Sequence, residues 1–550
     1  MGICIHLAIS SSVTDKEWAA VYQETLQLIK VFPLADTREI VIRGIPTICF
    51  TRTEEREYRY GRYKENSKTG WFAEGDYEYL RRAENYYLPR DLVSEDHYEE
   101  DDADAILCMV PQCLRAYHWD DPRFNHIHDL WGAKTQGEPY HIYLLSVACL
   151  IVSRLGRKAY VYGDITKGQC ERAVRMANEH LEQKIQTPDQ CDQDRLLSRI
   201  DGLSLSETEK LGLFTGLYLG HKDAEFGKTI REHYSKQACE EYWRGEFEEY
   251  RITQPGFERA FDEYLLWGFD LGEMCSYVVF QDADGKEHYD EFIRKVMDAK
   301  LHIQDKDCKD PLKINPDEEQ PYSVGTQFAQ LVFYSARNRK IDQFIPVEEI
   351  KSTLIHAIGG HCPVNDLIDQ YLKEEREQES ANLSNEASEG EFQNTVKQDP
   401  FRAFAQFMES ERTAYEEVRR KYAISEPEDL LYYETGDTLS PDLMEAVGRS
   451  LAVYRSALAE DTYQELMNKE PEERCRWLSE TNRYVLLRDK DWETIYEDIT
   501  SHTESFARYY PMVRVNITSE GIHSMVRAFV VNAALYSYAF ELEKMFEADH

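Results

Sequence analysis

The spacing of apolar residues changes once along this chain, near residue 190, and the change limits the folds that the chain can adopt. Before that point, strand-like and helix-like patterns alternate. After it, apolar residues recur almost only at the three- and four-residue spacing of helices. We therefore predict an α+β protein: an N-terminal mixed α/β domain followed by a predominantly α-helical remainder, either an irregular helical bundle or a solenoid-like array.

Residues 3–9 show the first strand pattern, because apolar and other side chains alternate as they do in a half-buried strand. Thr14 and Glu17 then form the T-x-x-E pattern of a capping box, which predicts the start of a helix. A strand pair is predicted at 39–50. The other N-terminal elements that we predict are a helix within 71–88, a strand at 105–111, a buried helix at 141–156, a strand at 158–163 and a capped helix at 166–181.

The length of the chain predicts several domains, because 550 residues exceed one ordinary hydrophobic core. An apolar fraction of 42% and an aromatic fraction of 12% argue against a largely disordered protein. One polar, acidic segment is poor in large apolar residues and is typical of a linker. We expect a mixed α/β domain at 1–185, a helical domain at 186–375 with a short hairpin near 276–290, the linker at 376–398, and a C-terminal helical domain at 399–550.

The charge balance restricts the partners, because 64 basic and 102 acidic residues give a net charge of −38. Such a surface repels phosphate, so nucleic-acid binding and binding to anionic membranes are disfavoured. The twelve cysteines form no CxxC pair, which is typical of free thiols in a reducing compartment. The longest apolar run, 142–152, is much shorter than the roughly 20 residues of a membrane span. We expect a cytoplasmic protein without a membrane segment.

The stretch from Phe124 to His141 is rich in histidine and suggests a metal site. In an extended segment His126 and His128 project to the same side, and Asp129 adds a carboxylate. Nitrogen and oxygen ligands of this kind suit zinc or another divalent metal, which would activate water for hydrolysis. The ligand spacing of known zinc motifs is missing, however, so the alternative is a polar connection that leads into the next helix. Further candidate ligands nearby are His118, Asp120 and His141.

Two other N-terminal segments suggest an anion site. Lys134 and Thr135 stand between two glycines ahead of a predicted helix, where backbone N–H groups would hold an anion. Asp164 follows a predicted strand, the position at which α/β proteins place ligand-facing groups, although it would also serve as a helix cap. Neither this Lys-Thr pair nor Lys228-Thr229 matches a phosphate-binding loop, because the required glycines are missing.

Residues 52–64 interleave arginine with tyrosine, and Arg59 and Arg62 are the central cations of this segment. Aromatic and basic groups together would stack on and neutralise a nucleotide or a single strand. The alternative is an exposed hairpin with cross-strand Tyr–Arg contacts. An acidic run at 95–104 would either cover this hairpin or bind a basic partner.

Cys362 is the best candidate for a nucleophile. Pro363 suits the first position of a helix, which would place the Cys362 thiol at the positive helix end beside His361 and favour the thiolate. No cysteine-protease signature surrounds the residue, and two glycines followed by proline are also typical of a structural corner between helices.

A helix-rich, acidic chain without a recognisable catalytic motif favours an interaction or regulatory role. We expect it to bind a protein partner or a small anionic ligand through its N-terminal domain. One alternative is a metal-dependent hydrolase that uses His126 and His128, and a less favoured one is a thiol enzyme that uses Cys362. Active sites assemble from distant positions, so whether the chain catalyses any reaction stays open.

Overall fold

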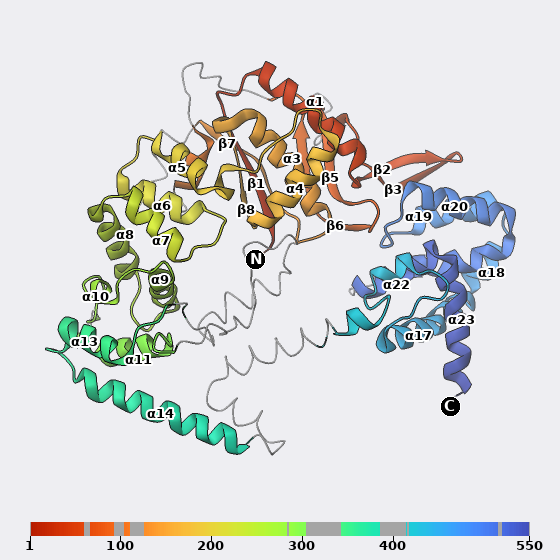
Figure 1. The fold of residues 1–550 in the computed structure, drawn as a ribbon. Coiled ribbons are helices and arrows are strands. Elements are labelled where there is room, and N and C mark those ends of the chain that lie inside the picture. Colours follow the sequence, from red (N-terminus) through yellow and green to blue (C-terminus); the bar gives the residue numbers. More distant parts are fainter. Residues whose placement is uncertain are drawn as a thin grey trace. The chain divides into compact units, whose positions relative to one another are not determined.

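In the part of the chain that the structure describes, the strands lie within the first 163 residues, and helices form nearly all of the regular structure that follows (Figure 1). This distribution confirms the α+β class. The computed structural model describes residues 2–59, 67–92, 104–110, 126–282, 285–303, 341, 343–385, 414, 417–514 and 520–548. Within these ranges, no helix combines the length and the hydropathy that crossing a membrane requires.

The chain forms two units, each built from segments that are far apart in the sequence. Unit 1 comprises Met1–Thr14, Ser94–Gly132 and Ala148–Ser410, and unit 2 comprises Asp15–Val93, Ala133–Val147 and Glu411–His550. Unit 1 therefore spans the boundaries that we predicted at residues 185 and 375. Unit 2 combines N-terminal strands with C-terminal helices.

A three-stranded sheet with the order β7-β1-β8 opens unit 1, and β1 and β8 are antiparallel. The central strand β1 (Cys4–Ser10) pairs with β8 (Ala159–Gly163), and His6 lies opposite Tyr162. Successive side chains of β1 point to opposite faces of the strand, as its sequence pattern predicts, and its apolar side chains are buried. The predicted strands at 3–9 and 158–163 are thus confirmed, and β7 (Ile127–Lys134) forms the other edge.

One prediction for this region is wrong. Residues 105–111 do not form a strand, because Ala105–Met109 is the 3-10 helix η1; Asp104 accepts a hydrogen bond from Ile106 N at 2.9 Å and turns the chain. A short apolar run fits a strand and a buried helical turn equally well. The predicted polar connection at 124–141 contains the eight-residue edge strand β7 and leads into the buried helix α3 (Tyr140–Leu155).

A buried ion-pair network holds η1 in place. Arg199 and Asp104 are 4% and 6% exposed, and Arg199 Nη2 donates to Asp104 Oδ1 at 2.7 Å. The same guanidinium donates to Asp189 Oδ2 at 3.2 Å and to the carbonyl oxygen of Ala159 at 3.2 Å. Both partners are removed from water, so each charge depends on the other.

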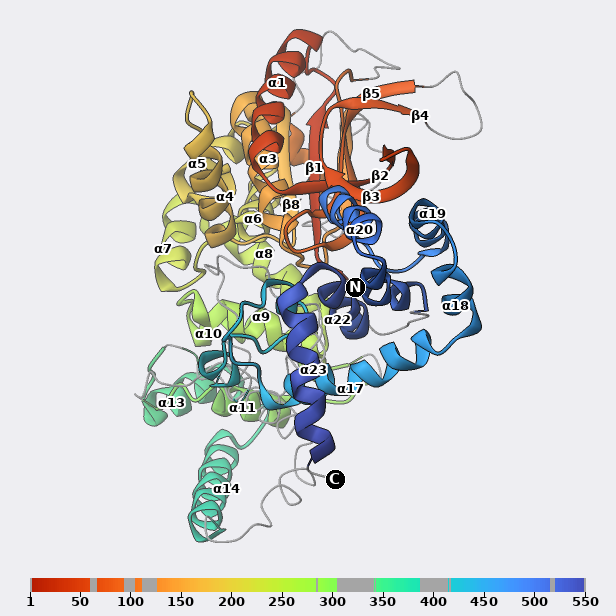
Figure 2. The same cartoon turned by 90° about the vertical axis from the view of Figure 1, so that its right-hand side faces the viewer.

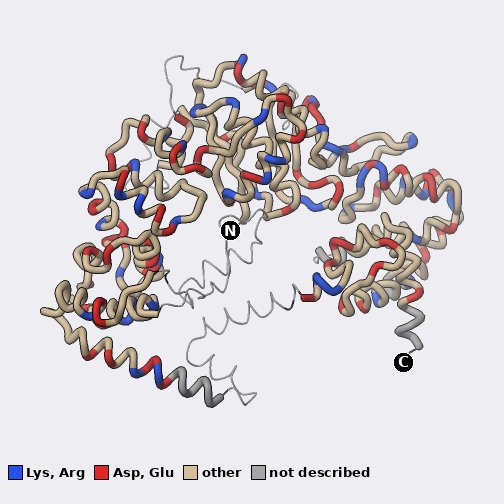
Figure 3. Tube along the Cα trace, viewed as in Figure 1, with Lys and Arg blue, Asp and Glu red and all other residues tan. Residues whose placement is uncertain are grey.

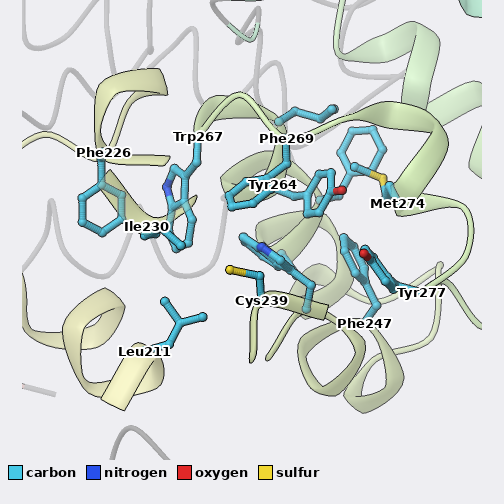
Figure 4. Close-up of a cluster of buried hydrophobic side chains, with 14 of the residues drawn as sticks. Leu211, Phe226, Ile230, Cys239, Phe247, Tyr264, Trp267, Phe269, Met274 and Tyr277 are labelled. Carbon is cyan, nitrogen blue, oxygen red and sulfur yellow. The ribbon is translucent and has the colours of Figure 1, made fainter. Parts of the chain in front are cut away.

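Helices make up the rest of unit 1, around a core rich in aromatic side chains (Figure 4). The ring of Trp243 lies 4.9 Å from that of Tyr264 and 5.0 Å from that of Trp267, measured between centroids. The helices of this part are α3 (Tyr140–Leu155, which continues from unit 2), α4 (Lys167–His180), α5 (Gln193–Asp201), α6 (Glu207–Leu217), α7 (Ala224–His233), α8 (Lys236–Glu249), α9 (Pro255–Leu266), α10 (Leu271–Met274), α11 (Tyr289–Asp298), α13 (Val347–Ile358) and α14 (Val364–Asn385).

Two details of these helices bear on the predictions. The Lys228-Thr229 pair lies inside helix α7, which agrees with the rejection of a phosphate-binding loop there. Helix α14 continues to Asn385, so the first ten residues of the predicted linker at 376–398 are helical, and the rest lies outside the described residues. Gln281 and Glu287 form an isolated antiparallel bridge within the predicted hairpin.

Unit 2 begins with helix α1 (Asp15–Val31) and a five-stranded antiparallel sheet with the order β3-β2-β5-β4, in which β6 also pairs with β5. The helix predicted within 71–88 is wrong, because this segment forms most of β5 (Ser67–Asp76) and β6 (Arg81–Pro89). Asp76 explains the error, since its carboxylate accepts the N–H groups of Glu78 and Tyr79 at 2.8 Å and closes a tight turn. The remaining strands are β2 (Leu34–Ile42), β3 (Ile45–Arg52) and β4 (Arg56–Arg59).

Hairpin β2–β3 packs one of its faces on the C-terminal helices of unit 2 (Figure 2). Ile42, Ile45 and Cys49 are buried in one core with side chains of α19 and α20. Thr47 Oγ1 lies 2.9 Å from the Tyr496 hydroxyl, and Ser479 donates to the carbonyl oxygen of Pro46 at 2.8 Å. The helices of this part are α17 (Pro441–Leu458), α18 (Asp461–Met467), α19 (Pro471–Thr481), α20 (Asp489–Ser501), α21 (Phe506–Tyr509), α22 (Glu520–Val531) and α23 (Ala533–Ala548).

Candidate functional site

The histidine-rich segment places its candidate ligands along the edge strand β7. His128 and Asp129 are adjacent and therefore project to opposite faces of the strand. Asp129 Oδ1 accepts a hydrogen bond from the Tyr162 hydroxyl at 2.9 Å, and burial raises the pKa of Tyr162 above its usual range, which keeps this donor protonated. His126 precedes the strand, and its carbonyl oxygen accepts the N–H of Ser11 at 2.8 Å.

The metal hypothesis gains no support from this geometry. Among the residues that the structure describes, no group of three or more histidine, cysteine, aspartate or glutamate side chains is arranged to hold a metal ion. His118 and Asp120 lie outside the described residues. His141 is buried, and its Nδ1 lies 2.6 Å from Thr135 Oγ1. A hydrolase that uses His126 and His128 stays a prediction.

The Lys134-Thr135 turn uses several of its polar groups within the chain. Lys134 N donates to Glu84 Oε2 at 2.9 Å, and Thr135 is fully buried against His141. Glu138, in the same turn, accepts both hydrogen bonds of a bidentate pair from Arg81, each at 2.9 Å. Carboxylates of the protein therefore already accept the hydrogen bonds of Lys134 N and of the Arg81 guanidinium, which a bound anion would need.

Asp164 forms hydrogen bonds with strand β1 of unit 1. Its carboxylate accepts the N–H of Cys4 at 2.7 Å, and its own N–H donates to the Cys4 carbonyl oxygen at 2.9 Å. Thr166 caps helix α4, in a capping box with Gln169. Asp164 lies in unit 1, whereas Lys134 and Thr135 lie in unit 2.

Within the tyrosine–arginine segment, strand β4 pairs antiparallel with β5 and carries a Tyr–Arg contact. Arg56 lies over the Tyr58 ring, 4.1 Å from its centroid, and both side chains bond to the buried carboxylate of Asp36. Arg59 is the last residue of β4, but its side chain and the whole of Arg62 lie outside the described residues. Other arginines of this sheet are paired with carboxylates: Arg38 with Glu54, Arg52 with Glu78, and Arg90 with Asp91.

Cys362 lies between helices α13 and α14, in surroundings that favour the protonated thiol. Burial raises the pKa of Cys362, and the carboxylate of Asp290 raises it further. The ring of His361 stacks on that of Tyr289, with centroids 5.1 Å apart. A nucleophilic cysteine needs the opposite pKa shift, so these contacts agree better with a structural corner than with a thiol enzyme.

His288 lies between two carboxylates of unit 1. Its Nε2 lies 3.2 Å from Asp282 Oδ2, and its Nδ1 lies 3.1 Å from Glu291 Oε1. The hydrogen bond to Asp282, and then that to Glu291, raises the pKa of His288. The contact joins Asp282 to the start of helix α11.

Replacing His288 by glutamine is expected to lower the midpoint of urea unfolding more at pH 6 than at pH 9. A raised folded-state pKa contributes stability that is fully present below the unfolded pKa of about 6.5 and is lost as the pH rises through the folded value. The measurement is the midpoint difference between wild type and His288→Gln at both pH values. In an Asp282→Asn background, this midpoint difference should depend less on pH. A midpoint difference that grows as the pH rises would contradict the raised pKa of His288.

The two most exposed large apolar side chains of the described residues lie on the same hairpin, β2–β3. Val41 is 70% exposed and Ile48 is 61% exposed. The strand register places Val41 opposite Pro46 and Glu39 opposite Ile48, so these four residues share the face that points away from the helices. We call Glu39, Val41, Pro46 and Ile48 the outward face of the hairpin. It offers apolar contacts and one carboxylate.

Sequence reasoning missed this outward face, although a signal for it was present. Ile40, Val41 and Ile42 follow one another, so both faces of the strand carry apolar residues. A half-buried strand needs an apolar side chain on only one face. Val41 and Ile48 give the hairpin a second apolar face, and both side chains are exposed in the described part of the chain.

No protein-family model, no curated protein and no solved structure matches this chain. Function has to be inferred from the described residues. The outward face of the hairpin carries the two most exposed large apolar side chains of the described residues, Val41 and Ile48.

Proposed function

We propose that this is an interaction protein that binds a positively charged protein segment on the outward face of hairpin β2–β3. The observation that carries the proposal is the joint exposure of Val41 and Ile48, at 70% and 61%, on one face of a strand pair. Large apolar residues that lie side by side in water are stabilised when a partner covers them. The rigid support of the hairpin by α19 and α20 favours such a use, because little order has to be gained on binding.

A protein partner agrees better with these contacts than a small anionic ligand does. Valine, isoleucine and proline side chains offer no hydrogen-bond donor to an anion. The arginines of the neighbouring sheet already pair with carboxylates, as Arg56 does with Asp36. An anion would have to displace those pairs before it could bind.

The charge of the chain favours a basic partner. The net charge is −38, and acidic residues are spread along both units rather than gathered in one segment (Figure 3). Glu39 adds a carboxylate on the outward face itself, opposite Ile48. A segment that alternates apolar and basic side chains would match this surface, and the complementary charge would speed its association. We place this interaction in the cytoplasm, because the ten described cysteines are free thiols.

The proposal is tested with a fluorescent probe peptide of about twelve alternating valine and lysine residues, the length of two typical strands. Two control peptides replace lysine by glutamate or valine by serine. Wild-type full-length protein is expected to bind the valine–lysine peptide in a fluorescence anisotropy titration, and both controls more weakly. Binding that is equal for the serine–lysine control would show that charge alone attracts the peptide, and would contradict the proposal.

The matched variants are Val41→Ser/Ile48→Ser and Val279→Ser/Ile355→Ser, which remove exposed apolar side chains from unit 2 and unit 1, respectively. Two aliphatic side chains that a partner covers contribute up to about 3 kcal/mol of binding free energy. Because about 1.4 kcal/mol corresponds to a tenfold change, the hairpin variant should bind the valine–lysine peptide roughly 10- to 100-fold more weakly. The control variant should bind like wild type. An equal loss in both variants, or no loss in the first, would contradict the proposed site.

A further inference from the structure

Arg474, in helix α19 of unit 2, is a buried cation that pairs with no carboxylate among the residues that the structure describes. It is 2% exposed. Its Nη1 donates to the carbonyl oxygen of Thr503 at 3.2 Å and lies 3.9 Å from the sulfur of Met467. Its Nε is buried without an acceptor, and Nη2 donates to none of the described residues. The edge of the guanidinium that carries Nε and Nη2 is therefore unsatisfied within the described part of the chain.

Two other buried arginines show what this edge binds elsewhere in the protein. Arg199 donates from Nε and Nη2 to the Asp104 carboxylate, at 3.1 and 2.7 Å. Arg488 donates from the same two nitrogens to the Asp491 carboxylate, at 2.7 and 3.0 Å. This side-on contact is the geometry in which a guanidinium matches the oxygen atoms of a carboxylate or a phosphate. Arg474 presents the same edge without such an acceptor.

The surroundings of Arg474 make an unpaired charge costly. Its guanidinium carbon lies 5.7 Å from the centroid of the Phe506 ring, which is fully buried. Cys475 and Leu478, on the same helix, belong to the same apolar core. A charge in such a medium is destabilising unless an opposite charge lies beside it, and the attraction between two charges is stronger there than in water. An anion at this edge would therefore gain much from the contact.

The guanidinium lies close to the surface, although it is buried. Thr503, whose carbonyl oxygen binds Nη1, is exposed, and so are residues 468–470, which connect α18 to α19. The segments on either side are short, because α18 has seven residues and the 3-10 helix η7 (Thr503–Ser505) has three. Short segments of this kind open locally at low cost, which gives a small ligand a route to Arg474.

We propose that Arg474 anchors a binding site for a small oxyanion, namely the carboxylate or phosphate group of a small molecule. Two oxygen atoms of the ligand accept the hydrogen bonds of Nε and Nη2, as the carboxylates of Asp104 and Asp491 do at the other two arginines. The net charge of −38 repels long polyanions and so favours a small ligand. This site is separate from the outward face of the hairpin and does not depend on the function proposed for it.

The test is an NMR titration of full-length protein that carries ¹⁵N-labelled arginine. The probes are inorganic phosphate and acetate, and chloride at the same ionic strength is the reference. The Nε–H signal of Arg474 is identified by its contacts with the Phe506 ring and by its absence in Arg474→Lys. It is expected to shift in a saturable way with phosphate or acetate and not with chloride. A response to phosphate alone assigns the site to phosphoryl groups, and a response to acetate alone assigns it to carboxylates.

Matched variants separate this site from general effects of salt. Lysine keeps the charge but lacks the two parallel donors, so the dissociation constant of the anion should rise roughly 10-fold in Arg474→Lys. Arg476→Met removes an exposed cation from the same helix and should leave the dissociation constant unchanged. The constants come from the rise of the urea midpoint with anion concentration. General stabilisation by phosphate acts on all three proteins alike and is subtracted.

Two results would overturn the proposal. One is an Nε–H signal of Arg474 that stays in place in wild type at the highest soluble concentration of both anions. The other is a midpoint that rises equally in wild type and in Arg474→Lys, or an anion response that Arg476→Met loses as completely as Arg474→Lys does. The wild-type titration decides the question even if Arg474→Lys does not fold, because the contacts with Phe506 identify the signal.

Discussion

Replacing Arg199 by methionine is expected to lower the free energy of unfolding by about 3–5 kcal/mol. Asp104 is 6% exposed and accepts from Arg199 Nε as well as from Nη2. Without the guanidinium, a buried carboxylate would keep its negative charge with no cation beside it. Asp189 and the carbonyl oxygen of Ala159 would lose a donor at the same time. The loss is measured as a shift of the urea midpoint, followed by tryptophan fluorescence and circular dichroism.

Arg195→Met is the matched control, because Arg195 also pairs with Asp189 but is 34% exposed in its side chain. Surface ion pairs of this kind contribute about 1 kcal/mol or less. Asp104→Asn in the Arg199→Met background should recover part of the loss, because the uncompensated charge disappears while the η1 cap keeps an acceptor. Equal destabilisation by the Arg199 and Arg195 variants would contradict the role given to the buried pair.

Gly227→Ala is expected to destabilise the protein by about 2 kcal/mol or more, although alanine is the better helix former. Gly227 lies in α7 where this helix touches Trp267. A Cβ at Gly227 would lie 1.8 Å from the carbonyl oxygen of Trp267 and 2.9 Å from its Cβ. Backbone atoms cannot move aside as a flexible side chain would, so α7 would have to separate from the chain at Trp267.

Gly245→Ala provides the opposite control. Gly245 lies in α8, and a Cβ there would meet no atom within 4 Å. The alanine should therefore stabilise its helix by about 0.5–1 kcal/mol through propensity alone. Thermal unfolding of the two variants separates packing from propensity, because their midpoints should move in opposite directions. A Gly227→Ala protein as stable as wild type would show that the contact between α7 and Trp267 is looser than described.

Local patterns predicted the elements whose signal lies within their own residues. The alternation at 3–9 became β1, the T-x-x-E pattern at Thr14 preceded helix α1, and the T-x-x-Q pattern at Thr166 became the capping box of α4. These signals depend on side chains two to four positions apart, which interact in the strand or helix itself. The same reasoning failed at 71–88, because Tyr and Trp spaced for a helix also suit a twisted strand pair.

The arrangement of the elements depends on contacts that the sequence pattern does not contain. β1 pairs with β8, some 150 residues further along the chain, and hairpin β2–β3 packs on helices beyond residue 470. Such contacts decide which elements share a core, and they divide the N-terminal 185 residues between two units. The sequence suggested Asp164 and Thr135 as ligand-binding residues, but both side chains form hydrogen bonds within the chain.

The outward face of the hairpin illustrates why a site is harder to predict than an element. The run from Ile40 to Ile42 shows that both faces are apolar, but not which face α19 and α20 cover. Only the packing of Ile42, Ile45 and Cys49 on those helices leaves Val41 exposed. A binding surface of this kind is defined by what the rest of the chain does not cover.

A methyl NMR titration tests the central claim most directly. Full-length protein labelled at isoleucine and valine methyl groups is titrated with the valine–lysine peptide, and the resonances are assigned by single substitutions. If the outward face is the docking surface, the methyl signals of Val41 and Ile48 will shift, while those of Val279 and Ile355 will stay in place. Shifts confined to methyl groups outside hairpin β2–β3, or no shifts at saturating peptide, would contradict the proposed function.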